Sequence, residues 1–354
     1  MNRRSAIRLV ACTTAGVALG APEARGAGMQ TIKVTGSTLM YPLFNRWAQE
    51  YRRVSPAVHV TTAATGSGAG ISQAIAGAVQ IGASDAYMTD EQMSATPGML
   101  NIPLAISSQL VTYNLPGLND AALKLDGPTL AGIYTGSIRA WDHATIVAMN
   151  PGVQLPRQAI VPIHRNDSSG DSFIFSQYLT FSTNSWEDGP SYGTDIAWPA
   201  VPGAKGATGN AGMVNSLAAT PYGIAYIGSS FTGEIATARL GVATLKNQAG
   251  KFIAANPDTV RSAAAQLSSR TPKDERLSLV FAPGANAYPL VNYEYAIVAA
   301  KQHDPAEAAA LRDFLLWAIA EGQGNQQSIL SPLHFATLPE FVRALSDAQI
   351  REIG

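Results

Sequence analysis

Apolar blocks alternate with polar turns along the N-terminal part of the chain, and the blocks have two different periods. Residues 31–37, 57–65 and 80–87 are short, largely apolar runs next to Gly, Ser or Thr, which predicts strands. Residues 41–53 carry apolar side chains at helical spacing, and residues 71–79 form a shorter block of the same kind. We therefore predict the order strand, helix, strand, helix, strand in this region.

The rest of the chain continues this alternation. Further apolar runs predict strands at 105–115, 159–163, 222–228 and 288–300. Helical spacing predicts two short helices around Trp141-Asp142, a helix at 171–181 and a helix at 304–322 with Asp304 as its cap, Pro305 in its first turn and Gly322 at its end. Residues 185–215 are rich in Gly, Pro, Trp and Asn, which predicts an extended loop.

Strands that alternate with helices are typical of an α/β fold with a mostly parallel sheet. The chain has 354 residues, of which 46% are hydrophobic, so two domains with separate cores are the natural expectation. Only 14% of the residues are charged, and 32 Gly and 21 Pro indicate many tight turns.

The first 26 residues have the pattern of an export signal. A basic start precedes the weakly apolar run 9–21, which is too short to span a bilayer. Arg3-Arg4 resembles the start of a twin-arginine signal, and Ala24-Arg25-Gly26 fits the small-x-small cleavage rule. We expect a cleaved signal peptide at 1–26 and a periplasmic or extracytoplasmic protein; the alternative is a flexible cytoplasmic tail.

Cys12 is the only cysteine of the chain. The run Leu9–Cys12 superficially matches the lipid-attachment motif of bacterial lipoproteins. However, most of the apolar run follows Cys12, whereas such a motif ends the run, so we do not expect a lipid anchor. Cleavage near Ala27 would remove Cys12 and leave a mature chain without disulfides or thiol chemistry.

The charges of the chain nearly cancel, with 24 basic against 25 acidic residues and a net charge of −1. This balance gives no attraction to nucleic acid or to an anionic membrane surface, and we expect neither as a partner. An anionic ligand would therefore have to be held by local geometry.

Three polar turns share one design that suits an anion. They are residues 35–39 (TGSTL), 65–70 (TGSGAG) and 166–172 (NDSSGDS), each after an apolar strand and at least two of them before a helix. A helix start offers free backbone N–H groups and a partial positive charge, Gly permits close approach, and Ser or Thr adds a hydroxyl donor. Ser and Thr are also ordinary helix caps, so the case rests on the three copies together with Arg165.

Asp85 is an unexpected residue in such a setting, because a carboxylate repels an anion. It becomes useful if the anion carries a proton that the carboxylate accepts. Hydrogen phosphate has such a proton, whereas sulfate at neutral pH has none and would face Asp85 as a second acceptor. A simple turn role for Asp85 is the alternative.

Several segments of the chain, taken in order, resemble those of a known family. The ordered segments TGSTLMYPLFNRW, TGSGAGISQAIAG, IGASDAY, YNLPG, LAGIYTGSIRAWD, NPGVQLP and HRNDSSGDSFIFSQYL, followed by YPLVNYEYAIV, are similar to the phosphate-binding receptors of bacterial phosphate-specific ABC transporters, the PstS family. The resemblance extends from about residue 30 to the C-terminus.

The resemblance implies a two-domain α/β periplasmic-binding-protein fold of type II. Each domain is expected to have a mostly parallel sheet flanked by helices, and a two-strand hinge to join them. Domain one would combine 29–112 with 290–354, domain two would span 113–289, and the ligand would lie in the cleft between them. Inorganic phosphate and the permease subunits of an ABC importer are the implied partners of a protein that we expect to be monomeric, without cofactor or metal.

The same resemblance implies the site residues. The implied phosphate ligands are Thr38, the backbone N–H of Leu39, Ser67, Asp85, Arg165, Ser169 and Gly170, with Asp167 orienting the arginine. Many members carry Thr where this chain has Asp171, so the SSGD sequence resembles an actinobacterial-like subgroup, whose members are often lipoproteins. We expect Asp171 to accept a second phosphate proton; capping the helix and pointing away is its alternative.

Other functions stay open on the sequence. Sulfate and molybdate receptors are disfavoured by Asp85, whereas arsenate is not distinguished from phosphate. A phosphatase would need metal ligands or a positioned base, but the five histidines are scattered and only His164 lies near a turn, so we do not expect an enzyme. A phosphate sensor or surface protein without a transporter is the remaining alternative.

Overall fold

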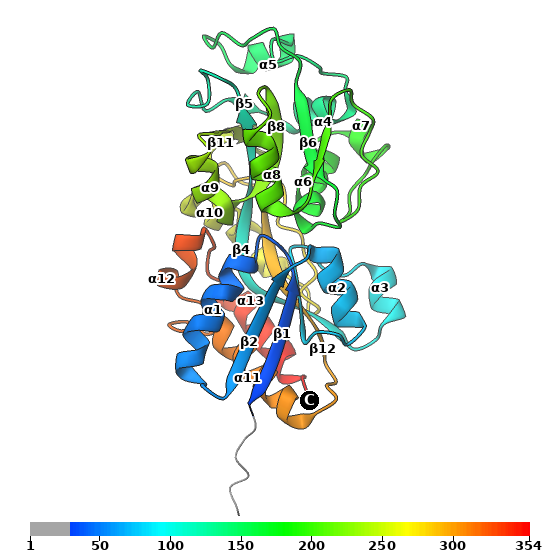
Figure 1. Ribbon diagram of the computed structural model, residues 1–354, viewed down its shortest axis with the longest axis vertical. Helices are drawn as coiled ribbons and strands as arrows, with labels where there is room; N and C mark the ends of the chain where they lie inside the picture. Colours follow the sequence, from blue (N-terminus) through cyan, green and yellow to red (C-terminus); the bar gives the residue numbers. More distant parts are fainter. Residues whose placement is uncertain (1–28) are drawn as a thin grey trace, which may run out of the picture.

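The computed structural model describes residues 29–354, so the predicted signal peptide 1–26 and Cys12 lie outside the described residues. The described chain forms two lobes, one above the other in Figure 1. A single mixed sheet runs through both lobes in the order β2-β1-β3-β12-β4-β8-β6-β7. The parallel pairs lie at its two ends, and antiparallel pairs involving β4 and β12 lie at its centre.

The lower lobe in Figure 1 is built from the N-terminal strand and helix units, in the predicted order. Its first elements are β1 (Gln30–Gly36), α1 (Tyr41–Val54), β2 (Val58–Ala64), α2 (Ser67–Ile75), β3 (Ile81–Ser84) and α3 (Asp90–Ala95). Helix α2 begins at Ser67 rather than at the predicted residue 71, because Gly66 takes the left-handed φ of 92° at the cap. Gly70 then packs so tightly that a Cβ there would lie 2.8 Å from the Ala83 carbonyl oxygen.

Two long central strands connect the lobes. β4 (Met99–Asn114) pairs with β12 (Val291–Ala299) in the lower lobe and, further along, with β8 (Gly223–Gly228) in the upper lobe. β4 begins at Met99, well before the predicted residue 105, because it is buried on both faces and has no alternating pattern to mark its start. Its register against β12 shifts beside Pro103, which lacks a backbone N–H.

The upper lobe contains three parallel strands and their helices. These elements are α4 (Gly127–Thr135), α5 (Ala144–Met149), β6 (Val161–Arg165), α6 (Gly170–Ser182), α7 (Asn184–Glu187), β7 (Lys205–Ala207), α8 (Gly209–Ala218), η1 (Ser229–Phe231) and α9 (Thr232–Thr237). A small sheet of β5 (Lys124–Leu125), β10 (Thr244–Lys246) and β11 (Phe252–Ile253) covers one edge, and β9 (Gly241–Val242) pairs with β4.

The predicted extended loop at 185–215 is wrong in part. This segment contains α7, β7 and the first turns of α8. Met213, Val214 and Leu217 of α8 are buried, and their spacing is that of an amphipathic helix. The Gly and Asn residues at the start of α8 concealed this pattern.

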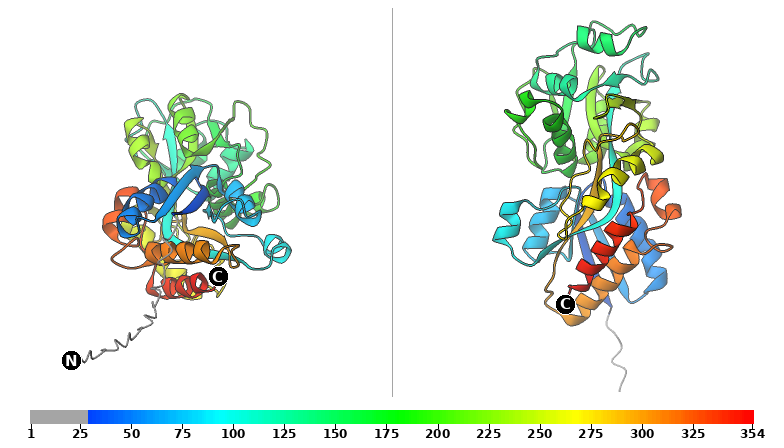
Figure 2. Two further views of the ribbon diagram at one scale, coloured as in Figure 1. Left: turned by 60° about the horizontal axis from the view of Figure 1, so that its bottom comes forward. Right: turned by 180° about the vertical axis from the view of Figure 1, so that it is seen from behind.

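The C-terminal segment returns to the lower lobe. It comprises α10 (Pro257–Leu267), η2 (Ser268–Arg270), β12, α11 (Pro305–Ile319), α12 (Gln327–Leu330), η3 (Ser331–Leu333) and α13 (Glu340–Arg351), with α11 and α13 side by side in Figure 2. Asp304 caps α11 as predicted, since its Oδ1 accepts a hydrogen bond from Ala306 N at 2.7 Å. Within residues 29–354, no helix combines the length and the hydropathy needed to cross a bilayer. The two-lobed α/β fold matches the expected class, while the domain limits 29–112 plus 290–354 and 113–289 stay a prediction.

Candidate anion-binding site between the lobes

The three polar turns predicted from the sequence meet where the two lobes touch. Gly68 N, at the start of α2, donates a hydrogen bond to Ser168 O across the interface at 3.2 Å. A Cβ on Gly170, at the start of α6, would lie 2.5 Å from Asp85 Oδ2 and 2.6 Å from Ser67 Oγ. The starts of α2 and α6 therefore face each other closely, and only a glycine fits at residue 170.

Helix starts from both lobes supply backbone donors at this place. Ser67 and Gly170 are the first residues of α2 and α6, and Ser169 is the cap of α6. Thr38 and Leu39 lie in the turn directly before α1, whose first residue is Tyr41. Converging helix starts concentrate free N–H groups and partial positive charge, which is a general way to bind an anion.

Arg165 ends β6 and is almost fully buried, with 2% of its surface exposed. Its Nε donates to Asp167 Oδ1 at 2.6 Å, its Nη2 donates to Asp167 Oδ2, and its Nη1 donates to Asp171 Oδ2 at 2.6 Å. Burial by itself lowers the pKa of Arg165, but the two carboxylates outweigh burial and raise that pKa. The guanidinium is therefore a permanent charge, held in one plane by Asp167.

The aromatic side chains of Tyr226 and Phe175 hold the backbone of Arg165 in place. Tyr226 Oη accepts a hydrogen bond from Arg165 N at 2.9 Å and lies 2.8 Å from Ser172 Oγ. The Tyr226 ring stacks on Phe175 of α6 at 4.5 Å between centroids. These contacts fix the end of β6 against the start of α6, which brings Arg165 and Gly170 to the same place.

Asp85 directly follows β3 and is 1% exposed. Ser37 Oγ donates to its Oδ1, and Ser67 Oγ donates to its Oδ2 at 3.2 Å. Burial raises the pKa of Asp85, and hydrogen bonds from Glu294 and Ser37 together with the Arg165 charge oppose that rise. The position of Asp85 between the helix starts places an acceptor next to their N–H and hydroxyl donors.

Asp171 is 1% exposed, and its side chain is directed toward Arg165 rather than away from the site. Gln109 Nε2 donates to its Oδ1 at 3.0 Å, and Asn210 Nδ2 donates to its Oδ2 at 2.7 Å. Burial and the nearby charge of Asp85 raise the pKa of Asp171 to about 6, although Arg165 acts in the opposite direction. The carboxyl group therefore titrates close to the pH range in which phosphate exchanges a proton.

Asn210 is a site residue that sequence analysis missed, because it lies in the segment predicted to be a loop. Besides Asp171, its Nδ2 donates to Thr38 Oγ1 at 2.9 Å, and its backbone N donates to the same oxygen at 3.2 Å. Asn210 therefore links the upper lobe to Thr38 of the lower lobe. Ser37 was missed as well, although it lies in the first predicted turn, and Oγ of this residue accepts from Met40 N at 3.0 Å.

Leu39 lies at the lobe interface through both its backbone and its side chain. Ser230 Oγ of the upper lobe donates to Leu39 O at 2.8 Å. Its side chain is fully buried and packs against Gly228, where a Cβ would lie 2.6 Å from Leu39 Cδ1. This packing holds the turn before α1 against the other lobe.

His164 does not join the site. Its ring stacks on Trp198 at 5.0 Å, and its Nδ1 lies 3.1 Å from Arg165 O. Among residues 29–354, no three His, Cys, Asp or Glu side chains are arranged to hold a metal ion.

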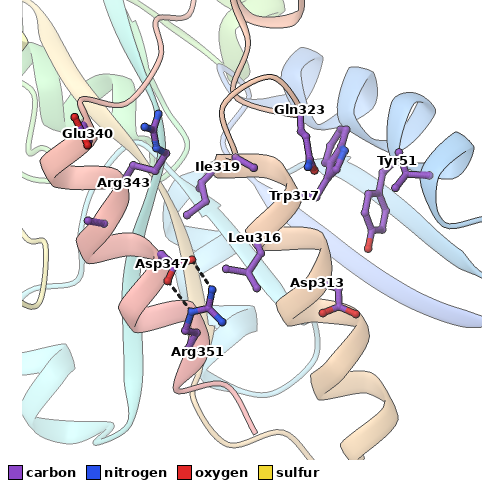
Figure 3. Close-up of a pocket in the computed structure, with 13 residues that line it drawn as sticks. Tyr51, Asp313, Leu316, Trp317, Ile319, Gln323, Glu340, Arg343, Asp347 and Arg351 are labelled. Atoms are coloured by element: carbon purple, nitrogen blue, oxygen red, sulfur yellow. Dashed lines mark hydrogen bonds and ion pairs between the residues drawn. The ribbon is translucent and has the colours of Figure 1, made fainter.

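A cavity of about 390 Å³ opens beside the site, between the lobes. Gly68 and Tyr87 line it from the lower lobe, and Ser168 and Phe173 line it from the upper lobe. A larger groove of about 750 Å³ lies elsewhere, between α1, α11 and α13 (Figure 3). Arg351 in that groove is paired with Asp347 at 2.7 Å, and none of the three turns lines the groove.

Two α/β lobes whose helix starts converge on one buried polar site define a two-lobed binding protein for an anionic solute. Consistent with this class, residues 21–321 match the family model described as a PBP superfamily domain. The phosphate-binding protein PstS of Methanocaldococcus jannaschii is 32% identical over 329 residues, covering 88% of this chain and 83% of that protein. The PstS of Pasteurella multocida is 30% identical over 320 residues and is covered to 90%, as is this chain.

The chain therefore belongs to the PstS family of phosphate-binding proteins within the PBP superfamily. The fold is also similar to that of the phosphate-binding protein from Stenotrophomonas maltophilia, with a TM-score of 0.69 and 19% identity. That comparison covers 90% of this chain and 93% of the other. Members of this family are substrate-binding proteins rather than a class of enzymes.

Proposed function

We propose that this protein binds inorganic phosphate outside the cytoplasm and delivers it to an ABC-type phosphate importer. The observation that carries the proposal is the arrangement at the lobe interface, where one buried arginine, Arg165, and two buried carboxylates, Asp85 and Asp171, meet between helix starts. Arg165 supplies the charge that any oxyanion needs. The carboxylates favour an oxyanion that carries protons, and phosphate is such an anion near neutral pH.

In this proposal the lobes hold the phosphate from both sides. The ligands are Thr38, the backbone N–H of Leu39, Ser67, Asp85, Arg165, Ser169, Gly170 and Asp171, and Asp167 orients Arg165. The hydroxyls and helix-start N–H groups donate to the phosphate oxygens that carry no proton. Asp85 accepts the proton of the dianion, and Asp171 accepts the second proton of the monoanion.

Sulfate would fit the shape of this site but not its hydrogen bonding. Both Asp85 and an unprotonated sulfate oxygen are acceptors, and no proton would lie between them. An unmade hydrogen bond in a buried site costs about 1–3 kcal/mol, and more for charged groups. Arsenate carries protons as phosphate does, so we expect it to bind.

We propose further that the protein is a receptor and not an enzyme, and that it acts as a monomer with permease subunits of the importer as its partners. The sequence pattern of residues 1–26 supports export by a cleaved signal. Binding between two lobes also suits delivery, because opening of the lobes would release the ligand at the permease.

Isothermal titration calorimetry of the exported protein, freed of bound phosphate, tests the proposal. We expect phosphate to bind at one site per chain, arsenate to compete with it, and sulfate and molybdate to be rejected. Tight sulfate binding, or the absence of phosphate binding by a folded protein, would overturn it.

A further inference from the structure

A second buried carboxyl group, that of Glu294, lies next to Asp85 in the lower lobe. Glu294 belongs to β12 and pairs with Ala105 of β4, and the next residue of β12, Tyr295, pairs with Ser84 of β3. The Glu294 side chain is completely buried. Its Oε1 accepts a hydrogen bond from Ser107 Oγ, whereas no donor among residues 29–354 reaches its Oε2.

The register of β12 against β3 brings Glu294 opposite Asp85, because Tyr295 pairs with Ser84 and Ala296 with Ala83, and each carboxyl group shifts the pKa of the other. Two ionised carboxylates have only acceptors, so a hydrogen bond between this pair requires a proton on one of the two. A buried pair of carboxyl groups shares a single proton for the same reason, because two like charges in close contact without water are strongly unfavourable.

The surroundings decide which of the two carries the proton. Asp85 receives hydrogen bonds from Ser37 and Ser67 and is close to the charge of Arg165. Glu294 receives one hydrogen bond, from Ser107, and faces the negative charges of Asp85 and Asp171.

The other elements packed against β12 do not change this balance. Helix α2 carries no charged residue. The charged residues of α10, Asp258 and Arg261, pair with each other at the surface. Burial and the Asp85 charge together raise the pKa of Glu294 well above its ordinary value.

We propose that Glu294 is a positioning residue that stays protonated and donates its proton in a hydrogen bond to Asp85, which keeps Asp85 ionised as an acceptor for phosphate. This inference rests on the proposed phosphate-binding function. It gives the buried glutamate a role in specificity without contact to the ligand. A protonated Asp85 would donate to an oxyanion instead, and the site would then admit sulfate.

Two variants separate a proton donor from a residue that only fills space. Glu294→Gln keeps a donor toward Asp85 and an acceptor toward Ser107, so the phosphate affinity should persist with its wild-type pH profile. Glu294→Leu removes the donor, and the pKa of Asp85 should rise. A rise of one pKa unit would lower phosphate affinity about tenfold on the acidic side, because a tenfold change in equilibrium corresponds to one unit.

The measurement is the affinity for phosphate and sulfate by calorimetry from mildly acidic to mildly alkaline pH, with thermal unfolding as a check of folding. We expect Glu294→Leu alone to lose phosphate affinity at acidic pH and to gain sulfate binding there. A folded Glu294→Leu protein with the wild-type profile for both anions would overturn the proposal. Tighter binding of phosphate and sulfate by Glu294→Gln at all pH values would also overturn it, since it would mean that the variant had removed a negative charge.

Infrared spectroscopy gives a readout that does not depend on phosphate binding. Burial raises the pKa of Glu275 to about 8, so this residue contributes the C=O stretch of a buried protonated carboxylic acid in both proteins at neutral pH. We expect the wild-type protein to show an additional band of this kind, from Glu294, that Glu294→Gln lacks. An identical carbonyl spectrum in both proteins would contradict a protonated Glu294. Loss of phosphate binding by the wild type would instead contradict the proposed function and leave this band in place.

Discussion

The two lobes contribute different chemistry to the same site. The upper lobe supplies Arg165 at the end of β6, with Asp167 and Asp171 hydrogen-bonded to its guanidinium. The lower lobe supplies Asp85 among serine hydroxyls at the starts of α1 and α2. The upper half thus provides charge, and the lower half provides an acceptor for a proton. If the protein binds phosphate as proposed, the upper lobe should set how strongly an oxyanion binds and the lower lobe should set which oxyanion binds.

The charge of the upper half gives the largest expected effect. Arg165→Ala should weaken phosphate binding by about 30-fold to several thousand-fold, because truncating one partner of a buried charge pair costs about 2–5 kcal/mol. Calorimetry measures the loss. Arg165→Lys should also bind more weakly, since an ammonium group lacks the planar fork that meets Asp167.

Arg351→Ala is the matched control, because Arg351 pairs with Asp347 on the exposed surface of α13. It should leave phosphate affinity unchanged. If Arg165→Ala folded and bound phosphate as the wild type does, the upper half would not supply the charge.

The lower half should control selectivity. Asp85→Asn should lower phosphate affinity by about 5-fold to 150-fold, since the phosphate proton loses its acceptor and an unmade buried hydrogen bond costs about 1–3 kcal/mol. The same variant should admit sulfate, because the amide donates where the carboxylate does not. Competition between phosphate and sulfate in calorimetry measures both changes. Continued rejection of sulfate by Asp85→Asn would remove Asp85 from the role of discriminating residue.

Asp171 lies in the upper lobe, but like Asp85 of the lower lobe it offers a carboxylate that can accept a phosphate proton. Asp171→Thr keeps a donor for the dianion and loses an acceptor for the second proton of the monoanion. The ratio of wild-type to variant phosphate affinity should therefore fall as pH rises from mildly acidic to mildly alkaline. Because one proton is involved, the fall should be at most about tenfold per pH unit. A ratio that does not change with pH would mean that Asp171 accepts no phosphate proton.

The last expected effect is on the stability of the protein without phosphate. The pKa of Asp171 is raised from its ordinary value of 3.8 to about 6 in the folded protein, so folding favours the protonated carboxyl group. This contribution to the free energy of unfolding is fully present below about pH 4 and is lost as the pH rises from there through about 6. Asp171→Asn has no carboxyl to ionise, so its stability relative to the wild type should rise over the same interval, by no more than about 3 kcal/mol. Urea unfolding of phosphate-free protein at several pH values measures the difference. A constant difference across this range would show that Asp171 titrates elsewhere.

Much of the fold was predictable from the sequence because its signals are local. The strand and helix order of the lower lobe and the cap of α11 follow from apolar spacing and from Asp304. The converging turns were predictable for the same reason, since Gly and Ser after a strand mark a helix start. Residue 171 was visible as a departure from the family pattern, but its contacts with Gln109 and Asn210 were not.

The missed features depend on contacts between distant parts of the chain. Asn210 reaches Thr38 only because α8 of the upper lobe packs against the turn before α1. Glu294 lies in a quoted motif of a predicted strand, but the register of β12 against β3 and β4 brings it behind Asp85. Strand register and the approach of two lobes are set by the whole fold, and no short sequence pattern reports them.

A crystal structure of the phosphate complex tests the division of the site most directly. We expect one phosphate at the lobe interface, whose unprotonated oxygens accept hydrogen bonds from Arg165, from the hydroxyl of Ser169 and from the backbone N–H of Gly170. A different phosphate oxygen should lie within about 2.5–2.7 Å of a carboxylate oxygen of Asp85, the distance of a charge-assisted O–H···O hydrogen bond. A phosphate bound without contact to Asp85, or bound in the groove beside Arg351, would contradict the proposed roles of Arg165 and Asp85.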